Sequence, residues 1–239
     1  MARTMIWAAL AGGAVVVMTT AARAQDVQTW SLSGTVGTQP VGVELTITDN
    51  NVFDAGHYFY DSQLKDIPLT GKETGATLTL KEAGGGVFHL TLQGGANFNV
   101  ATGLSGTWTQ GSQTLPVTLS LASAHVGADG GHLYGDVTSE SDEKFEARVR
   151  KFLSAVLAGN KVEAASAVSY PLAVNGAHKL TVKNAAQLET DWGEIFTPGL
   201  IAQLKTAVPH DMFVHDGMAM LVNGAVWFNA KGATALNLP

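Results

Sequence analysis

The sequence contains no cysteine, and only 14% of its 239 residues carry a charge. Without cysteine the chain cannot form disulfides, use a thiol nucleophile or hold zinc through thiolates. It also lacks the residue through which bacterial lipoproteins are anchored. Stability must therefore come from buried apolar side chains, and two domains of about 100 residues each can bury enough of them.

Motifs of several large enzyme classes are also missing. The sequence has no glycine-rich nucleotide-binding motif, no G-x-S-x-G nucleophile turn and no H-E-x-x-H zinc motif. We therefore expect no cofactor and no bound metal, and the lack of a catalytic constellation favours a binding protein over an enzyme.

Long hydrophobic runs are scarce as well. The apolar run at residues 7–18 is shorter than the roughly 20 residues that a membrane-spanning helix needs. Arg3 precedes it and Ala22-Arg23-Ala24 follows it, which is typical of a signal peptide with its cleavage site. We expect residues 1–24 to be removed on export to the periplasm or the medium, and the mature chain to have no membrane span.

Basic residues are few relative to acidic ones. The sequence has 14 basic and 20 acidic residues, and removal of Arg3 and Arg23 would leave 12 against 20, a change in net charge from −6 to −8. This sign argues against nucleic acid as a partner. Residues 25–126 hold 8 acidic and 3 basic side chains. Such a surface either keeps the protein in solution or attracts a basic partner, and charge alone leaves both open.

Residues 25–126 alternate between apolar and polar side chains with a period of two. The alternation is clearest at Val41, Val43, Leu45 and Ile47. Similar runs cover 57–61, 67–69, 77–82, 87–93, 104–109 and 115–121, with turns rich in glycine and asparagine between most of them. The pattern predicts an antiparallel all-β domain that closes into a barrel or half-barrel.

The segment 56–61, G-H-Y-F-Y-D, holds the densest set of polar-tipped side chains in this region. Alternation places His57, Phe59 and Asp61 on one face of a strand and Tyr58 and Tyr60 on the other. His57 and Asp61 then lie too far apart to form a catalytic pair, and the tyrosines suit cross-strand packing.

Several short runs in this half resemble a β-rich module of uncharacterised bacterial envelope proteins, some of which accompany lysozyme-inhibitor-like domains. The runs are 56–61, 66–71 (D-I-P-L-T-G), 78–82 (L-T-L-K-E), 88–90 (F-H-L), 104–108 (L-S-G-T-W) and 115–119 (L-P-V-T-L). They are packing and turn residues, so the resemblance implies a fold and a compartment but no reaction.

A glycine-containing stretch at 127–139 reads as a linker, and a long amphipathic helix follows it at 139–159. The apolar residues of this helix recur on one stripe and need a partner surface. Ser139 and Asp142 have the spacing of a capping box. The stripe consists of Phe145, Val149, Phe152, Leu153, Val156 and Leu157.

Residues 140–239 mix helices with strands. A short helix is possible at 161–168, and alternation at Tyr170, Leu172 and Val174 up to Asn175-Gly176 predicts a hairpin. Asn184 and Thr197-Pro198 are helix-start signals. Residues 212–228 read as a three-stranded meander. We expect an α+β cone in which the long helix packs on a curved antiparallel sheet.

This order of elements resembles the nuclear transport factor 2-like, or cystatin-like, superfamily. The runs 169–176 (S-Y-P-L-A-V-N-G), 194–198 (E-I-F-T-P) and 224–228 (G-A-V-W-F) resemble a periplasmic branch of it. The superfamily includes isomerases and dehydratases as well as binding modules without chemistry, so the resemblance leaves the function open.

A pocket in the cone would supply the candidate site residues. In an enzyme, Asp191 or His215 would act as the general base and Tyr170 would donate to a developing oxyanion. Tyr170, Trp192 and Trp227 are the candidate ligand-binding residues. The alternative for both tryptophans is core packing, since large aromatic side chains dominate buried surface.

The segment 210–216, H-D-M-F-V-H-D, is the densest ionisable cluster. His210 and His215 are five residues apart, which directs them to opposite faces of a strand, and the same interval is poor on a helix. We therefore expect no metal site there.

Two functions remain at this point. The first is an exported, non-catalytic binding or interaction protein of the bacterial envelope, with an envelope protein, a glycan or a small molecule as ligand, in one version an inhibitor of a cationic hydrolase. The second is a small isomerase- or dehydratase-like enzyme. The packing of Phe145, Phe152 and Leu153 distinguishes these two functions. If these side chains fill the cone, the enzyme is excluded, and if they leave a lined pocket, it remains.

Overall fold

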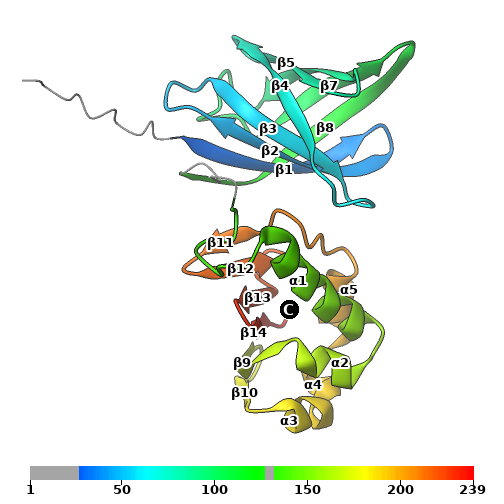
Figure 1. Ribbon diagram of the computed structural model, residues 1–239, viewed down its shortest axis with the longest axis vertical. Coiled ribbons are helices and arrows are strands. Elements are labelled where there is room, and N and C mark those ends of the chain that lie inside the picture. The colour runs from blue at the N-terminus through cyan, green and yellow to red at the C-terminus, as the bar shows by residue number, and fades with distance from the viewer. Residues whose placement is uncertain (1–26, 127–131) are drawn as a thin grey trace, which may run out of the picture.

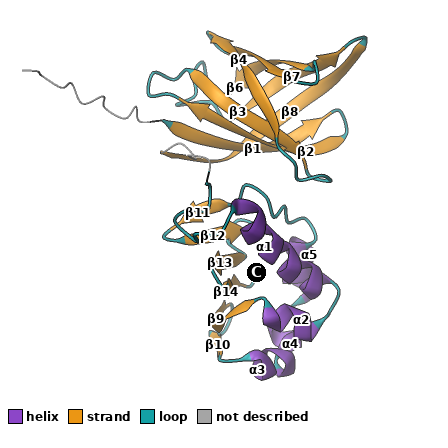
Figure 2. Ribbon diagram, viewed as in Figure 1, coloured by secondary structure: helices purple, strands orange, loops and turns teal. Residues whose placement is uncertain are grey.

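A computed structural model describes residues 27–126 and 132–239, and it shows two domains of different architecture (Figure 1). The first is a closed barrel of eight antiparallel strands, and the second is a six-stranded mixed sheet with helices on one side (Figure 2). The predicted signal peptide and residues 127–131 of the predicted linker lie outside the described residues. Within the described ranges, no helix combines the length and the apolar character needed to cross a membrane.

Each barrel strand pairs with its neighbour in sequence, and β1 and β8 close the ring. Pairing of β1 with β8 runs from Gln28 opposite Val126 to Val36 opposite Val117. The strands are β1 (Gln28–Val36), β2 (Gln39–Ile47), β3 (Phe53–Tyr60), β4 (Ile67–Thr74), β5 (Thr77–Glu82), β6 (Val87–Gln93), β7 (Gly103–Gln110) and β8 (Gln113–Val126). The predicted antiparallel barrel is confirmed, in its closed form.

The interior of the barrel is a packed core. Alternation along each strand turns large apolar side chains inward, and an eight-stranded barrel is just wide enough for side chains to fill. Trp30 and Phe98 meet edge to face with ring centroids 5.0 Å apart, and Tyr58 contacts Phe88 in the same way at 5.1 Å. Tyr58 thus points inward, on the face opposite His57 and Phe59 as the alternation predicted, and the outer face of β3 is left to His57 and Phe59.

In the described residues, the second domain begins with its longest helix, which is followed by six strands and four shorter helices. Its elements are α1 (Asp142–Leu157), α2 (Lys161–Ser166), β9 (Val168–Asn175), β10 (Leu180–Val182), α3 (Ala185–Thr190), α4 (Trp192–Ile195), α5 (Pro198–Leu204), β11 (Phe213–His215), β12 (Met218–Leu221), β13 (Val226–Asn229) and β14 (Gly232–Asn237). The side chains of Asn184 and Thr197 cap α3 and α5, as predicted.

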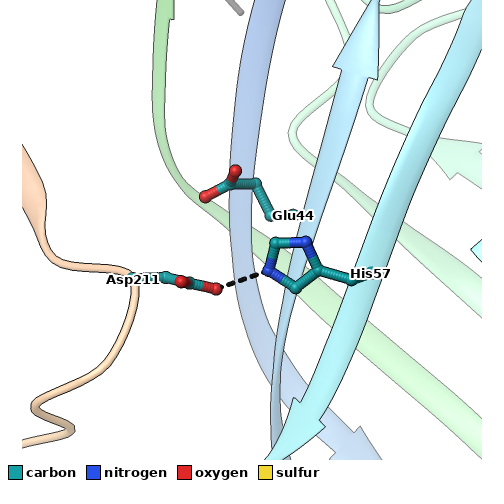
Figure 3. A group of neighbouring side chains, drawn as sticks. All are labelled: Glu44, His57 and Asp211. Atoms are coloured by element: carbon teal, nitrogen blue, oxygen red, sulfur yellow. Dashed lines mark hydrogen bonds and ion pairs between the residues drawn. The ribbon is translucent and has the colours of Figure 1, made fainter. Parts of the chain in front are cut away.

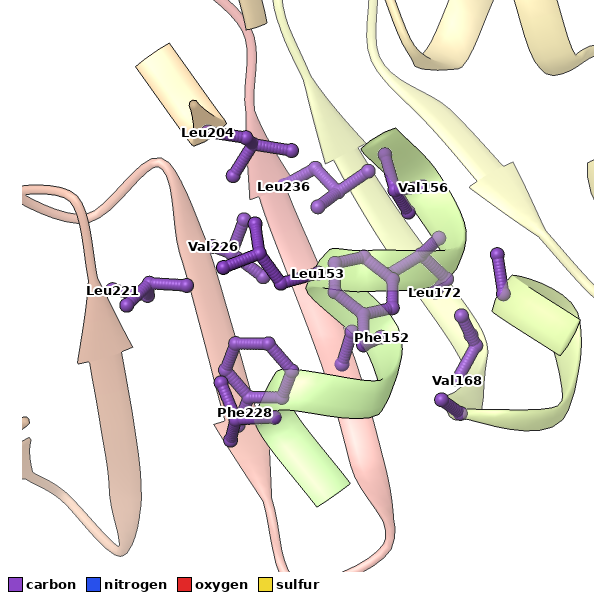
Figure 4. Packing of buried hydrophobic residues seen from close by; sticks show 14 of the residues in the cluster. Phe152, Leu153, Val156, Val168, Leu172, Leu204, Leu221, Val226, Phe228 and Leu236 are labelled. Atoms are coloured by element: carbon purple, nitrogen blue, oxygen red, sulfur yellow. The ribbon is translucent and has the colours of Figure 1, made fainter. Parts of the chain in front are cut away.

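The predicted stripe of α1 packs against the sheet (Figure 4). Phe145, Val149 and Phe152 have no exposed surface, and Phe152 meets Phe228 of β13 at 5.4 Å. Leu157 is the exception: it is 39% exposed, because it lies in the last turn of the helix. The side chains of α1 and the sheet therefore fill the space that a pocket inside the cone would occupy.

The predicted capping box at Ser139 and Asp142 is wrong. The residue at the N-cap of α1 is Ser141, and its side chain makes no capping bond. Asp142 instead turns back on the preceding segment, where its carboxylate accepts from the backbone N–H groups of Leu133 and Tyr134 at 2.9 and 3.1 Å. Residues 132–134, assigned to the linker, are thereby bonded to the second domain.

The predicted sheet is also corrected, since it is mixed rather than antiparallel. The strand order is β10-β9-β14-β13-β12-β11, and β14 runs parallel to β9 while every other pair is antiparallel. The reason is a fourth meander strand, β14, that the sequence pattern did not indicate. It lies between β13 and β9, which would themselves have been antiparallel neighbours.

Candidate functional site

The outer face of β2 and β3 is covered by the second domain. Glu44 and His57 are direct partners across these strands, as are Gly42 and Phe59. All four belong to the outward set of the alternation, yet Glu44 is only 8% exposed and Phe59 only 4%. Side chains on the outer face of a barrel are normally exposed to solvent, so the burial of Glu44 and Phe59 identifies the contact between the domains.

The segment between α5 and β11 supplies the other side of this contact. It carries His210 and Asp211, whose backbone has φ +45°, in the left-handed region that aspartate tolerates better than most residues. The ring of His210 lies edge to face on Phe59 with centroids 4.5 Å apart. Two halves of the chain that are distant in sequence thus meet through one loop.

His57 and Asp211 join the domains directly (Figure 3). The Nε2 atom of His57 lies 2.7 Å from Oδ2 of Asp211, and the same Nε2 is 3.5 Å from Oδ1 of Asp66. Burial by itself would lower the pKa of His57, but the hydrogen bond and the charge of Asp211 outweigh it, so the pKa is raised. The ion pair is favoured where water is partly excluded.

His210 bonds to a carboxylate at each ring nitrogen. Its Nδ1 lies 2.7 Å from Glu146 and its Nε2 lies 2.9 Å from Asp66. Burial would lower the pKa of His210, but the hydrogen bonds with Asp66 and Glu146 raise it to about 10. His210 is therefore an imidazolium at neutral pH, and its hydrogen bond lowers the pKa of Asp66 in turn.

Glu146 of α1 supports the loop that carries His210 and Asp211. It is 5% exposed, and its Oε1 accepts from the hydroxyl of Tyr134 at 3.0 Å and from the backbone N–H of Asp211 at 3.3 Å. Its Oε2 accepts from Arg150 at 3.3 Å as well as facing His210. A buried carboxylate is stable only with such partners, and these partners fix the position of Asp211.

Tyr134 extends this support into the core of the second domain. Its side chain is fully buried, and its hydroxyl accepts from the backbone N–H of Met212 at 3.0 Å while donating to Glu146. Burial, followed by the charge of Glu146, raises the pKa of the Tyr134 hydroxyl, so that it remains a donor.

Two cavities lie at the contact between the domains. The first, about 340 Å³, has Ser31, Ser33, Phe59 and Asp61 of the barrel on one side. The second, about 360 Å³, is lined by six ionisable side chains that come from both domains and from the join. These are Glu44, His57, Asp66, His132, Asp142 and Asp211.

The structure does not bring the predicted catalytic candidates together. Tyr170 lies on β9 and His215 on β11, four strand positions apart in the sheet, which is about 19 Å at a spacing of roughly 4.8 Å per strand. The hydroxyl of Tyr170 donates to the carbonyl of Ala165 at 3.3 Å, and Asp191 accepts from Gln187 at 3.2 Å. The side chain of His215 is 62% exposed and lies 3.4 Å from Asp216.

The predicted ligand-binding tryptophans are half-buried and lie in different places. Trp192 of α4 packs on Phe196 with ring centroids 4.3 Å apart, and Lys161 lies 5.9 Å above its ring. Trp227 of β13 lies opposite Met220 and Ala235 in the sheet. Neither tryptophan lines either of the two cavities.

The site that the structure presents could be foreseen from the sequence only in fragments. His57 and the cluster at 210–216 stood out by residue type, but their partners are distant in sequence. Residue Asp66 lies 144 positions before His210, and Glu146 lies 64 before it. A buried glutamate within a helix of alternating charges has no distinguishing local signal, so Glu146 was missed.

Chemically, the site offers carboxylates and imidazoles that can accept or donate protons or bind a cation. Glu44, His57 and Asp211 have donor atoms within 4.8 Å of one another, and so have Asp66, His210 and Asp211. No protein-family model, curated protein or solved structure matches the chain.

Proposed function

We propose that this chain is an exported, non-catalytic binding protein of the bacterial envelope, and that it binds a small molecule in the 340 Å³ cavity between its two domains. The observation that carries the proposal is that both domains line this cavity. Binding sites for small molecules favour such contacts between domains, and this volume falls at the lower end of their usual range of about 300–1,000 Å³.

The walls of the cavity indicate the class of ligand. Phe213 of β11 and Met220 of β12 are register partners, and both line the cavity opposite Phe59 of the barrel. Carboxylates from Glu44, Asp61 and Asp211 also border it. A ligand with an apolar body and one amine or hydroxyl group matches these walls, because apolar area drives burial and the acidic groups bind the polar end.

The filled core of the second domain supports a binding role over the enzyme alternative. Phe145, Phe152 and Phe228 have no exposed surface. A catalytic pocket in the cone would need these side chains to stand apart, and Tyr170 and His215 to converge.

The proposal includes the family of the second domain. A long first helix packed on a sheet, followed by a hairpin, short helices and a meander, is the order expected for the nuclear transport factor 2-like, or cystatin-like, superfamily. Export is proposed from the signal-peptide pattern of residues 1–24.

A thermal-shift screen of amphipathic amines and alcohols tests the binding site. Ser33 is exposed on the outer face of β1 and lines the cavity, so Ser33→Trp should fill it. Thr91→Trp is the matched control, because Thr91 is exposed on the outer face of β6, outside the lining residues. A compound should raise the Tm of the wild type and of Thr91→Trp but not that of Ser33→Trp. The absence of any stabilising compound, or equal shifts in all three proteins, would overturn the proposal.

A further inference from the structure

Two side chains of the barrel and one of the second domain place potential metal ligands close together (Figure 3). Glu44 of β2, His57 of β3 and Asp211 of the loop before β11 each offer one such atom, and these atoms lie within 4.8 Å of one another. One imidazole nitrogen and two carboxylate oxygens form a donor set that first-row divalent ions accept.

The fold holds the three donors in place before any ligand arrives. Glu44 and His57 are direct cross-strand partners, so the rigid barrel fixes their spacing. Asp211 is held through its backbone N–H, which donates to the buried carboxylate of Glu146 at 3.3 Å. Supporting hydrogen bonds of this kind orient the ligands of metal sites.

The distances require little adjustment. Nε2 of His57 and Oδ2 of Asp211 are now 2.7 Å apart. Two ligands with bonds of about 2.0–2.1 Å to a tetrahedral ion lie about 3.4 Å from each other. The carboxylate of Asp211 would have to move by about 0.7 Å to admit the ion in place of the hydrogen bond.

The surroundings favour a cation and can complete its coordination. The 360 Å³ cavity beside the three donors is also lined by Asp66 and Asp142, so four carboxylates face the imidazoles of His57 and His132. The imidazolium of His210 bonds to Asp66 and lies 3.9 Å from Asp211, and the four carboxylates still outnumber this one cation. A concave wall with an excess of one charge concentrates ions of the opposite sign. The cavity leaves room for the water that usually completes a site with three protein ligands.

We propose that Glu44, His57 and Asp211 bind one first-row divalent transition ion, and that this ion links the barrel to the second domain. The neighbouring set of Asp66, His210 and Asp211 is less suitable, because both ring nitrogens of His210 already bond to carboxylates and the side chain of Asp66 is 48% exposed. Glu44 and Asp211 border both cavities, so the ion and the polar end of the organic ligand would share these carboxylates. The metal site still goes beyond the proposed small-molecule function, since it needs none of the apolar walls of the first cavity.

Calorimetric titration of the tag-free mature chain with Zn²⁺, after removal of metal with EDTA, tests the site. We expect one Zn²⁺ per chain, a rise in Tm at saturation, and weaker binding of Mg²⁺ and Ca²⁺, which use imidazole poorly. His57→Ala, Asp211→Asn and the nearly isosteric Glu44→Gln should each weaken Zn²⁺ binding at least tenfold, since loss of a mere supporting group costs about 10–100-fold.

His89→Ala is the matched control, because His89 is exposed on β6 and lines neither cavity. It should bind Zn²⁺ as the wild type does. Far-UV circular dichroism establishes that each variant is folded. The proposal is overturned by absence of Zn²⁺ binding, by equal affinity for Mg²⁺, or by unchanged affinity in folded Glu44→Gln and His57→Ala. Ser33→Trp should keep Zn²⁺ binding while losing the organic ligand, which separates this proposal from the small-molecule function.

Discussion

The imidazole of His57 and the carboxylate of Asp211 form a hydrogen bond of 2.7 Å although they are 154 positions apart in the sequence. The two side chains keep only 24% and 14% of their surface exposed. One belongs to the barrel and the other to the mixed α+β domain, so the bond is both a link between domains and the centre of the candidate site.

The first prediction concerns the strength of this link in the absence of metal. His57→Ala in EDTA should lower the free energy of unfolding by about 1–3 kcal/mol, because a hydrogen bond to a charged partner is lost and Asp211 remains partly buried. Urea denaturation followed by circular dichroism measures it. His89→Ala, on the exposed face of β6, should stay within about 0.5 kcal/mol of the wild type. Equal stability of the two variants would show that the link contributes nothing.

The second prediction tests the support beneath the loop. Tyr134→Phe removes a fully buried hydroxyl that donates to Glu146 and accepts from the backbone N–H of Met212. Both partners remain buried without it, and a buried polar group that loses its partner costs about 1–3 kcal/mol. Equilibrium urea unfolding should show this loss.

Tyr170→Phe is the matched control for that experiment. Tyr170 is half-buried, and its hydroxyl makes a single bond of 3.3 Å to the carbonyl of Ala165, which water can replace. We expect a loss below about 1 kcal/mol. A Tyr134→Phe variant no less stable than Tyr170→Phe would mean that Glu146 and Met212 find other partners.

Local pattern was sufficient to predict the barrel, because most of its strands alternate and most of its turns carry a glycine or asparagine signal. The stripe of α1 was predictable for the same reason, except at Leu157, which is the last residue of the helix and is 39% exposed. The strand β14 was missed, and its insertion beside β9 changes the sheet from antiparallel to mixed. Strand order is set by long-range pairing, which no local period encodes.

The site was less predictable than the fold. His57 and Phe59 were correctly assigned to one face, but the partner of His57 is Asp211, which belongs to another domain. The interval between His210 and His215 predicts no metal site, but it concerns only residues close in sequence. The metal donors proposed above come from two barrel strands and a distant loop, so only the tertiary structure brings them together.

The third prediction concerns a glycine at the contact between the domains. A Cβ on Gly42 would lie 2.1 Å from the ring of its cross-strand partner Phe59, so Gly42→Ala must displace that ring. Phe59 in turn packs on His210. Overpacking of this kind costs about 1–3 kcal/mol. The free energy of unfolding of Gly42→Ala should fall by that amount.

A double-mutant cycle identifies the cause. In a Phe59→Ala background the ring is gone, and Gly42→Ala should then cost less than about 0.5 kcal/mol. Gly193→Ala serves as control, because a Cβ at Gly193 would meet no atom within 4 Å, and alanine is preferred over glycine in a helix such as α4. If the penalty at Gly42 persists without Phe59, the clash lies with the strand itself and not with the ring.

The last prediction tests whether the second domain is filled, which is where the binding and enzyme alternatives divide. Phe152 has no exposed surface, and the centroid of its ring lies 5.4 Å from that of Phe228 and 6.2 Å from that of Phe196. In a close-packed core, Phe152→Ala removes the contacts of a whole ring and leaves a cavity, at a cost of about 3–5 kcal/mol. Leu157→Ala on the same helix removes a side chain that is 39% exposed and should cost less than about 1 kcal/mol. Urea unfolding of both variants gives the comparison. Similar small losses for the two would indicate that the ring of Phe152 borders open space, and that result would restore a pocket inside the cone, one of the two conditions for an enzyme, the other being the convergence of Tyr170 and His215.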